Sequence, residues 1–150
     1  MRNAPPGYRC PFCQLADTLP TPTPEPSIIL IEPRVFAFVP LHHYAGIRGN
    51  CLVAPRAHYE NVMDIPDELG SDFFRATRLI AAAMQDAFGC AGISTRQHNG
   101  SAGNQDVWHY HLHIFPRFRD DDLYEGEKAL YGAEERLEVA ARLRSSLHEA

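Results

Sequence analysis

The chain has 150 residues, of which 45% are hydrophobic and 22% are charged. This composition fits one globular domain over residues 1–150, and a chain of this length buries about 68–70% of its unfolded surface. The formal net charge of −5 and a pI near 5.9 argue against a generally basic surface for nucleic acid. No apolar stretch reaches transmembrane length, and Pro5, Pro6 and Gly7 stand where a signal peptide needs an apolar run. We therefore expect a cytoplasmic protein without nucleic-acid or membrane partners.

Two cysteines near the start of the chain, Cys10 and Cys13, form a C-x-x-C knuckle. Such a pair presents two thiolates to one zinc ion or acts as a redox dithiol. A redox pair normally lies between a strand and a helix, whereas this one runs into a proline-rich segment. That position favours zinc. Cys51, in an apolar strand, and Cys90, just after a helix, are interpreted as small core residues.

The first half of the chain predicts three strands. Residues 17–27 carry four prolines and are expected to form an extended arm with little to bury. Short apolar runs at residues 28–32 and 35–39 then predict a hairpin. After a glycine-bearing loop at residues 41–49, the apolar residues 51–54 predict a third strand.

The second half predicts two helices around a fourth strand. A long helix is expected to open at Ile65-Pro66 and to end at Gly89. Its expected buried stripe recurs every three to four residues, at Leu69, Phe73, Thr77, Ile80, Met84 and Phe88. Residues 92–97 predict the strand, and residues 119–122 are interpreted as a solvated charge run. A closing helix over residues 134–147 is expected to pack through Leu137, Ala140, Ala141, Leu143 and Leu147.

Residues 108–117 alternate three histidines with apolar side chains, which predicts a β-strand with His109, His111 and His113 on one face. The outer two histidines would then lie about 13.5 Å apart at Cα, so one metal ion could bind two neighbours but hardly all three. At least one imidazole therefore needs another role. The polar, glycine-rich loop at residues 98–105 feeds this strand, and such a loop lets a bulky anion approach the backbone.

The block from Asn99 to Arg117, with its H-x-H-x-H-x-x-P-R motif, resembles the histidine triad (HIT) family of nucleotide-binding hydrolases and transferases. The C-x-x-C pair and residues 49–58 extend the resemblance over most of the chain. It implies an α+β fold with an antiparallel sheet of about five strands, one long central helix and a C-terminal helix. It also implies a homodimer whose sheets join.

The resemblance is to the zinc-bearing bacterial type, and it implies a metal site made of Cys10, Cys13, His58 and His109. Two thiolates and two imidazoles would close a tetrahedral zinc site, and a closed site leaves no position for a reactive water. We therefore expect structural Zn²⁺ that pins the amino-terminal arm to the histidine segment.

The resemblance also assigns roles at the reaction centre. His111 is expected to be the nucleophile, with a hydrogen bond at Nδ1 that directs the Nε2 lone pair at phosphorus. His113 would lie against the phosphate and help the leaving group depart. Gln105 matches the glutamine that positions phosphate and water, and Asn99 and Asn50 are assigned to the phosphate side.

Three departures from the family pattern stand out. Asn50 replaces a histidine, unless His42 or His43 folds back to take its place. Asp106 stands where Ser or Thr is usual, and a carboxylate there repels phosphate unless it points away or pairs with a cation. No acidic residue near Pro40 corresponds to the one that often holds the ribose.

Together these features predict a nucleotide hydrolase that cleaves a phosphoanhydride or phosphoramidate bond at the α-phosphorus through a covalent nucleotidyl-His111 intermediate. The histidine at position 113 favours hydrolysis over transfer. A dinucleoside polyphosphate phosphorylase or nucleotidyltransferase is one alternative, and a zinc-stabilised nucleotide-binding module with little turnover is another. A third alternative makes His109 and His111 ligands of a catalytic zinc ion.

Overall fold

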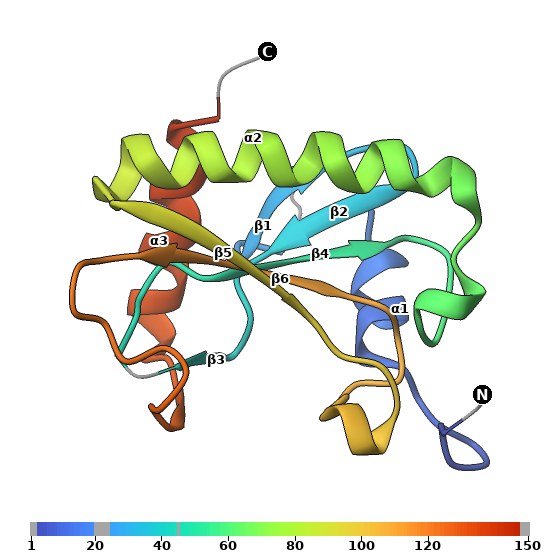
Figure 1. Cartoon of the computed structure of the whole chain (residues 1–150). Coiled ribbons are helices and arrows are strands. Elements are labelled where there is room, and N and C mark those ends of the chain that lie inside the picture. The colour runs from blue at the N-terminus through green and yellow to red at the C-terminus, as the bar shows by residue number, and fades with distance from the viewer. Residues whose placement is uncertain (1–2, 20–24, 45, 148–150) are drawn as a thin grey trace.

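The computed structural model describes residues 3–19, 25–44 and 46–147. The centre of the predicted proline-rich arm, residues 20–24, lies outside the described residues. In the described part, a five-stranded antiparallel sheet is covered on one face by a long helix, and a shorter helix follows at the C-terminal end (Figure 1). This arrangement confirms the predicted α+β fold. Of the described helices, none combines the length and apolarity that crossing a bilayer requires.

The sheet has the strand order β1-β2-β4-β6-β5. Its strands are β1 (Ile28–Ile31), β2 (Val35–Phe38), β4 (Cys51–Pro55), β5 (Gly92–Gln97) and β6 (Leu112–Arg117). The predicted hairpin of β1 and β2 is confirmed, as are the third and fourth predicted strands. β6 lies between β4 and β5, where His113 pairs with Leu52 on one side and Arg96 on the other.

The alternation of side chains along the strands gives the sheet two different faces. The face that carries Val35 and Val53 packs against helices α2 (Gly70–Phe88) and α3 (Ala133–Ser145). The opposite face carries Phe36, Phe38, Leu52 and Ala54, which pack with residues of the short helix α1 (Pro11–Ala16). Helix α1 therefore lies on the side of the sheet remote from α2 (Figure 1).

Helix α2 begins later than the sequence predicts. Two 3₁₀ turns, Val62–Asp64 and Asp67–Leu69, precede it, and α2 itself starts at Gly70. It ends as expected, because Gly89 adopts a left-handed conformation (φ 61°) and its N–H donates to the Gln85 carbonyl. Of the expected stripe, Thr77 and Phe88 are only partly buried, and the stripe is completed by the small residues Ala76 and Ala83.

Helix α3 packs along a narrower face than predicted. Ala140 and Leu143 are fully buried as expected, and Val139 joins them. Leu137 and Ala141 are exposed, because each residue turns a helix by about 100° and only the line through 139, 140 and 143 meets α2 and β1.

The predicted loop over residues 41–49 contains a strand, β3 (His42–Tyr44). It pairs with β7 (Lys128–Leu130) in a separate two-stranded ribbon, with Tyr44 opposite Lys128. The ribbon was not predicted because its two strands are more than 80 residues apart, and neither has an apolar run of its own.

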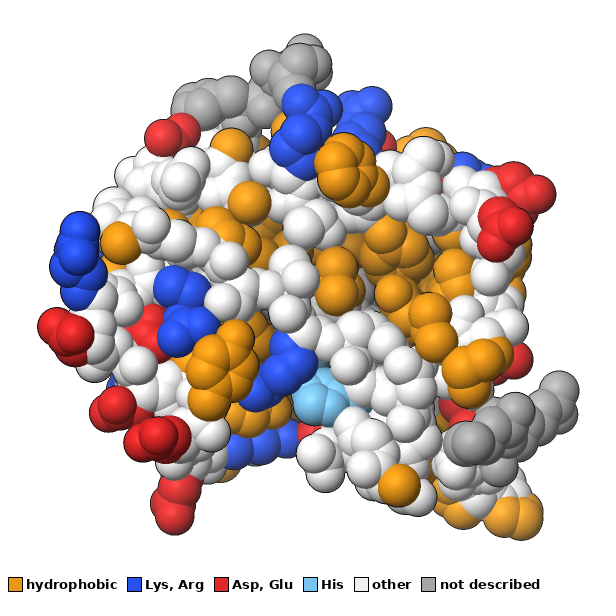
Figure 2. Space-filling view, viewed as in Figure 1, with side chains coloured by type: hydrophobic (Ala, Val, Ile, Leu, Met, Phe, Trp, Pro, Cys, Tyr) orange, Lys and Arg blue, Asp and Glu red, His pale blue; other side chains and the backbone are white. Residues whose placement is uncertain are grey.

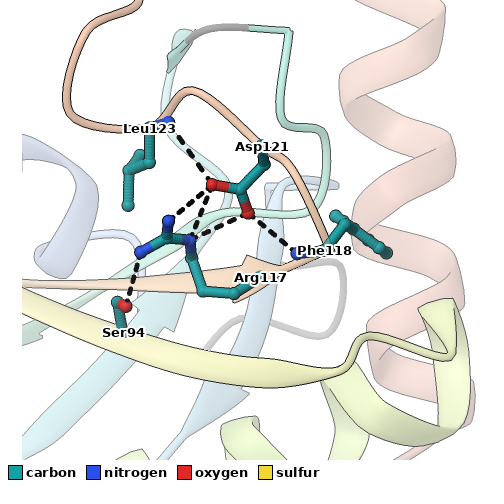
Figure 3. Close-up of polar contacts among 5 residues, drawn as sticks. All are labelled: Ser94, Arg117, Phe118, Asp121 and Leu123. Carbon is teal, nitrogen blue, oxygen red and sulfur yellow. Dashed lines mark hydrogen bonds and ion pairs between the residues drawn. The ribbon is translucent and has the colours of Figure 1, made fainter.

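The charge run at residues 119–122 is only partly solvated. Acidic side chains gather over the loop between β6 and β7, in the lower left of Figure 2. Asp120 and Asp122 are exposed, but the Asp121 side chain is only 7% exposed and pairs with Arg117. Its carboxylate also accepts the N–H of Phe118 at 2.8 Å, while Arg117 donates to Ser94 (Figure 3). Asp121 therefore closes the turn that follows β6.

Candidate active site and metal centre

The histidine segment is only partly a strand. β6 begins at Leu112, so His109 and His111 precede it, which corrects the prediction of one strand over residues 108–117. In place of a sheet partner, the N–H of Tyr110 donates to the carbonyl of Tyr59 at 2.6 Å. The predicted alternation nevertheless holds.

The two sides of this segment contact different helices. The Tyr110 ring meets Phe73 of α2, with 5.0 Å between centroids. The rings of His109 and His111 instead meet Phe12 of α1, at 5.7 and 5.2 Å. The C-x-x-C helix and the histidines therefore share one side of the sheet.

The predicted metal ligands converge in one cluster. One donor atom from each of Cys10, Cys13, His58 and His109 lies within 4.8 Å of all the others. The Sγ atoms of Cys10 and Cys13 lie 3.3 and 3.5 Å from His109 Nδ1, and Cys13 Sγ lies 3.2 Å from His58 Nδ1. A tetrahedral zinc ion with bonds of about 2.0–2.3 Å holds neighbouring ligand atoms about 3.3–3.8 Å apart. These four residues could therefore hold a metal ion.

The surroundings of the cluster also suit a metal. The Nε2 atom of His109 lies 2.9 Å from the Pro55 carbonyl, a contact that leaves Nδ1 as the free lone pair. Burial lowers the pKa of His109 to about 4, so its ring is neutral, as a ligand must be. Burial and the adjacent Cys10 thiol raise the pKa of Cys13 to about 12, and a cation between the two sulfurs would reverse that effect.

His111 is buried, and one side of its ring is fixed. Its Nδ1 atom lies 2.7 Å from the His109 carbonyl, which places the proton on Nδ1 and leaves the lone pair on Nε2. This geometry agrees with the hydrogen bond expected from the sequence. Burial lowers the pKa of His111, so the neutral form dominates at pH 7.

His113 lies next to His111, with 5.0 Å between ring centroids, and it stacks on Phe115. Its Nδ1 atom is buried and has no hydrogen-bond partner among the described residues. Burial, together with the charges of His111 and Arg96, lowers the pKa of His113 to about 2. In the free protein, His113 is therefore a neutral imidazole with an unused nitrogen.

A cavity of about 350 Å³ opens beside these two histidines. That volume is in the range of small-molecule sites. Apolar residues of α1 and the sheet line much of it, while Asp106, His111, His113 and Lys128 provide a polar part. The full lining is Pro11, Phe12, Leu15, Glu25, Phe38, Pro40, Leu41, His42, Tyr44, Leu52, Asp106, Val107, His111, His113, Lys128 and Arg136.

Gln105 and Asn99 both hold the loop before the histidines. The Oε1 atom of Gln105 accepts the N–H of Gly100 at 2.8 Å, and its Nε2 donates to the carbonyls of Glu60 and Val107. Asn99 Oδ1 accepts the N–H of Val62 at 2.7 Å. Neither residue belongs to the cavity lining, and the hydrogen bonds above tie both side chains to backbone groups.

Asn50 is fully buried and also lies outside the cavity lining. Its Oδ1 accepts the Tyr131 hydroxyl at 2.6 Å, and its Nδ2 donates to the His42 carbonyl. His42 itself lines the cavity, whereas His43 is buried and its ring meets Tyr131. Of these two histidines, His42 is the one that the ribbon of β3 and β7 brings to the cavity.

Three residues near the site were not singled out from the sequence. His98 lies beside His113, with 5.8 Å between ring centroids, and its Nδ1 is 2.6 Å from the Gly103 carbonyl. The Arg96 guanidinium lies over the rings of Tyr44 and Phe115. Lys128 forms an ion pair with Asp106, at 2.6 Å. On the face seen in Figure 2, a histidine side chain surfaces among basic side chains.

The fold and the three histidines define a histidine triad protein of the α+β class. A family model described as the HIT domain matches residues 24–120, and the chain belongs to this family. It is 35% identical to the protein hit of Bacillus subtilis over 75% of this chain and 74% of that one.

Two further relatives have activities in their names. The chain is 32% identical to adenosine 5′-monophosphoramidase HNT1 of Saccharomyces cerevisiae, over 75% of this chain and 64% of that one. It is 31% identical to adenylylsulfatase HINT3 of Arabidopsis thaliana, over 59% of this chain and 42% of that one. The family thus includes nucleotide hydrolases.

Two solved structures of similar proteins superpose on this chain. The structure of a zinc-bound histidine triad family protein from Mycobacterium smegmatis superposes with a TM-score of 0.75 and 25% identity, over 92% of each chain. A HIT-like protein from Bartonella henselae, bound to an unknown ligand, superposes with a TM-score of 0.73 at 29% identity, over 81% of this chain and 86% of that one.

Proposed function

We propose that this protein hydrolyses a phosphoanhydride or phosphoramidate bond at the α-phosphorus of a nucleotide, with His111 as the nucleophile. One observation carries the proposal: the buried His111 ring lines the cavity while the His109 carbonyl holds its Nδ1 atom. Two relatives named as a monophosphoramidase and an adenylylsulfatase support the reaction class.

The first chemical step follows from the tautomer of His111. The neutral ring presents its Nε2 lone pair, which attacks the α-phosphorus as the bond to the leaving group breaks. The Nδ1 proton stays on the ring, and the His109 carbonyl stabilises the positive charge that the ring acquires. Water then attacks the phosphorus of the nucleotidyl-histidine as the P–N bond breaks and gives up one proton to solvent, which releases the nucleoside monophosphate and restores the neutral imidazole.

His113 is suited to stabilise this reaction. It is in ring contact with His111, and its Nδ1 atom has no partner among the described side chains and backbone groups. A buried polar atom without a partner is costly, and a bound phosphate group would relieve that cost. We propose that His113 hydrogen-bonds to the phosphate oxygens or to the leaving group. We propose that Gln105 and Asn99 hold the loop at residues 98–105 in place beside the bound phosphate.

The apolar part of the cavity is proposed to take the base. Phe12, Leu15, Phe38 and Leu52 line it and present ring and aliphatic surface of the kind that nucleobases pack against. Because Phe12 lies inside the C-x-x-C motif and contacts the rings of His109 and His111, helix α1 connects the base end to the reaction centre.

We propose that the Cys/His cluster binds structural Zn²⁺ in four-coordinate form. Cys10, Cys13, His58 and His109 would be its ligands, and they would tie helix α1 to the histidine segment. His111 does not take part in this cluster, which disfavours a catalytic zinc held by His109 and His111. A homodimer and a cytoplasmic location stay predictions from the family resemblance and the sequence.

The experiment that tests the function compares wild type with His111→Ala on adenosine phosphoramidate and on a diadenosine polyphosphate, each with inorganic phosphate present. We expect wild type to release AMP and His111→Ala to be slower by about a thousandfold. Unchanged metal content and melting temperature would show that the variant is folded. ADP in place of AMP as the product from the phosphoramidate would indicate a phosphorylase, and tight binding without turnover would indicate a binding module. Either result contradicts the proposal.

A further inference from the structure

Lys128 is the only lysine among the 14 Lys and Arg residues of this chain, and it lies at the candidate site. It comes from β7, the outer strand of the ribbon that β3 completes. Its side chain is 38% exposed, whereas His111 is only 3% exposed. Lys128 therefore stands at the mouth of the cavity, while His111 lies deeper inside.

The partner of Lys128 is a carboxylate that would otherwise oppose an anionic substrate. Lys128 Nζ lies 2.6 Å from Asp106 Oδ2, and both residues line the cavity together with His111 and His113. Although burial acts the other way, Asp106 raises the pKa of Lys128 overall, so the ammonium stays charged. The positive charge of Lys128 therefore offsets the negative charge of Asp106 in the part of the cavity that phosphate has to approach.

The second cation of the cavity is held more firmly. Arg136 Nε donates to the carbonyls of Val39 and Pro40 at 3.0 and 3.2 Å, and its guanidinium lies 3.7 Å from Glu25. Lys128 is held at the rim by Asp106 alone among the contacts found for its ammonium. An ammonium has three N–H donors, so Lys128 can keep Asp106 and still donate to a bound anion.

We propose that Lys128 binds the anionic leaving group and that the site therefore favours nucleotides whose α-phosphate carries a phosphate, polyphosphate or sulfate group over those that carry an amine. This inference rests on the proposed hydrolase function. The base would occupy the apolar interior and His111 would meet the α-phosphorus, so the part of the substrate farthest from the base would reach the mouth and Lys128.

The charge of the leaving group determines how much Lys128 can stabilise the transition state. When a phosphoanhydride or phosphosulfate breaks, the electrons of the P–O bond go to the departing oxygen, and the charge that develops there is stabilised by the Lys128 ammonium, which keeps its proton. When a phosphoramidate breaks, the electrons of the P–N bond go to the nitrogen, which takes up a proton from solvent and leaves as a neutral amine. Lys128 therefore contributes little to the cleavage of a phosphoramidate, because no negative charge develops on the leaving amine.

The test compares two substrates that differ only in the leaving group, adenosine 5′-phosphosulfate and adenosine 5′-phosphoramidate. We expect Lys128→Gln to lower kcat/KM for the phosphosulfate by about tenfold or more and to change kcat/KM for the phosphoramidate by less than about threefold. Lys128→Arg should retain part of the preference. Asp106→Asn should raise kcat/KM for the phosphosulfate, because Lys128 is then released to the substrate.

Arg48→Gln is the matched control. Arg48 forms an ion pair with Glu135 that has the same 2.6 Å length and a similar exposure but lies outside the cavity lining. Its replacement should change kcat/KM for neither substrate. Equal effects of Lys128→Gln on both substrates would overturn the inference and leave the hydrolase function standing. A wild type that cleaves neither substrate would overturn both.

A second measurement does not need turnover. Because Lys128 is the only lysine, an amine-acetylating reagent modifies one side chain, and peptide mass spectrometry reports its rate. We expect α,β-methylene-ADP, whose β-phosphate stands in for the leaving group, to slow acetylation of Lys128 by about fivefold or more relative to AMP. Equal protection by the two nucleotides would contradict the assignment of Lys128 to the leaving group.

Discussion

The Nδ1 atom of His111 lies 2.7 Å from the carbonyl oxygen of His109, so the proposed nucleophile is oriented by the backbone of a proposed metal ligand. His109 is in turn held through Nε2 by Pro55 and through Nδ1 by the cysteines. The metal cluster and the reaction centre therefore share one short segment. A change in the metal cluster should therefore alter the catalytic rate by moving the His109 carbonyl that orients His111.

Removal of the metal is predicted to lower stability first and activity as a consequence. Zinc bound at about 1,000 times its Kd adds about 4 kcal/mol to the free energy of unfolding. A chelator should therefore lower the melting temperature of wild type, and Cys13→Ala should show the low value from the start. The matched control is Cys90→Ala, a buried free cysteine outside the cluster, which should keep the chelator response. If Cys13→Ala and Cys90→Ala respond alike, the cluster is not the metal site.

Gln105→Ala is predicted to lower stability and activity together. The side chain is 5% exposed and holds Gly100, Glu60 and Val107, so its loss leaves buried backbone groups unpaired at a cost of about 2 kcal/mol. Urea unfolding and kcat/KM measured on the same samples check this. Gln85→Ala, at an exposed position of helix α2, is the control and should leave both quantities unchanged. A loss of kcat with unchanged stability would instead indicate a direct contact of Gln105 with substrate.

Elements with a local signal were predictable. Strand β5 occupies the predicted residues 92–97, because its apolar and β-branched residues lie between turn signals. The left-handed Gly89 likewise marks the end of α2. The four metal ligands were expected through the family resemblance, and the structure brings them together from three separate parts of the chain.

Pairings between distant segments were not predictable. The ribbon of β3 and β7 depends on a partner far along the chain, and with it came the approach of Lys128 to Asp106. The sequence predicts that Asp106 repels phosphate unless a cation pairs with it, but no local pattern identifies Lys128 as that cation. The burial of Gln105 and Asn50 likewise depends on segments that are distant in the sequence, and no local pattern indicates it.

The ion pair of Arg117 and Asp121 predicts a loss of stability in acid. Hydrogen bonds from Arg117 lower the pKa of Asp121 to about 2, below the value of about 3.9 in an unfolded chain. A lowered folded-state pKa stabilises the protein above pH 4, and this contribution disappears as the pH falls from about 4 towards 2.

Asp121→Asn should therefore lower the free energy of unfolding by about 1 kcal/mol at pH 7, with a smaller difference from wild type at pH 2.5. Urea titrations at both pH values measure this. Asp122→Asn, next to it but exposed, should behave as wild type. A difference between Asp121→Asn and wild type that is as large at pH 2.5 as at pH 7 would exclude the ion pair as its cause.

Gly49→Ala is predicted to be strongly destabilising, by about 2–3 kcal/mol. Gly49 has φ 101°, which side chains rarely adopt, and a Cβ atom there would lie 2.6 Å from Cε2 of Phe88. The matched control is Gly70→Ala at the start of α2, where the new Cβ would meet no atom within 4 Å apart from its chain neighbours and the backbone of its own helix, and alanine favours the helix. Thermal unfolding should show a lower melting temperature for Gly49→Ala and an equal or higher one for Gly70→Ala, relative to wild type. Similar melting temperatures for the two variants would contradict the close approach of Phe88.

The most direct test of catalysis by His111 is intact mass spectrometry of protein mixed with an adenosine phosphoramidate or a diadenosine polyphosphate and stopped under mild alkali. We predict a transient mass increase of one nucleotidyl group in wild type and its disappearance in both His111→Ala and His111→Gly. An adduct that persists in these variants would place the nucleophile elsewhere. The absence of an adduct, together with no loss of substrate over several nucleotides, would contradict covalent catalysis by this protein.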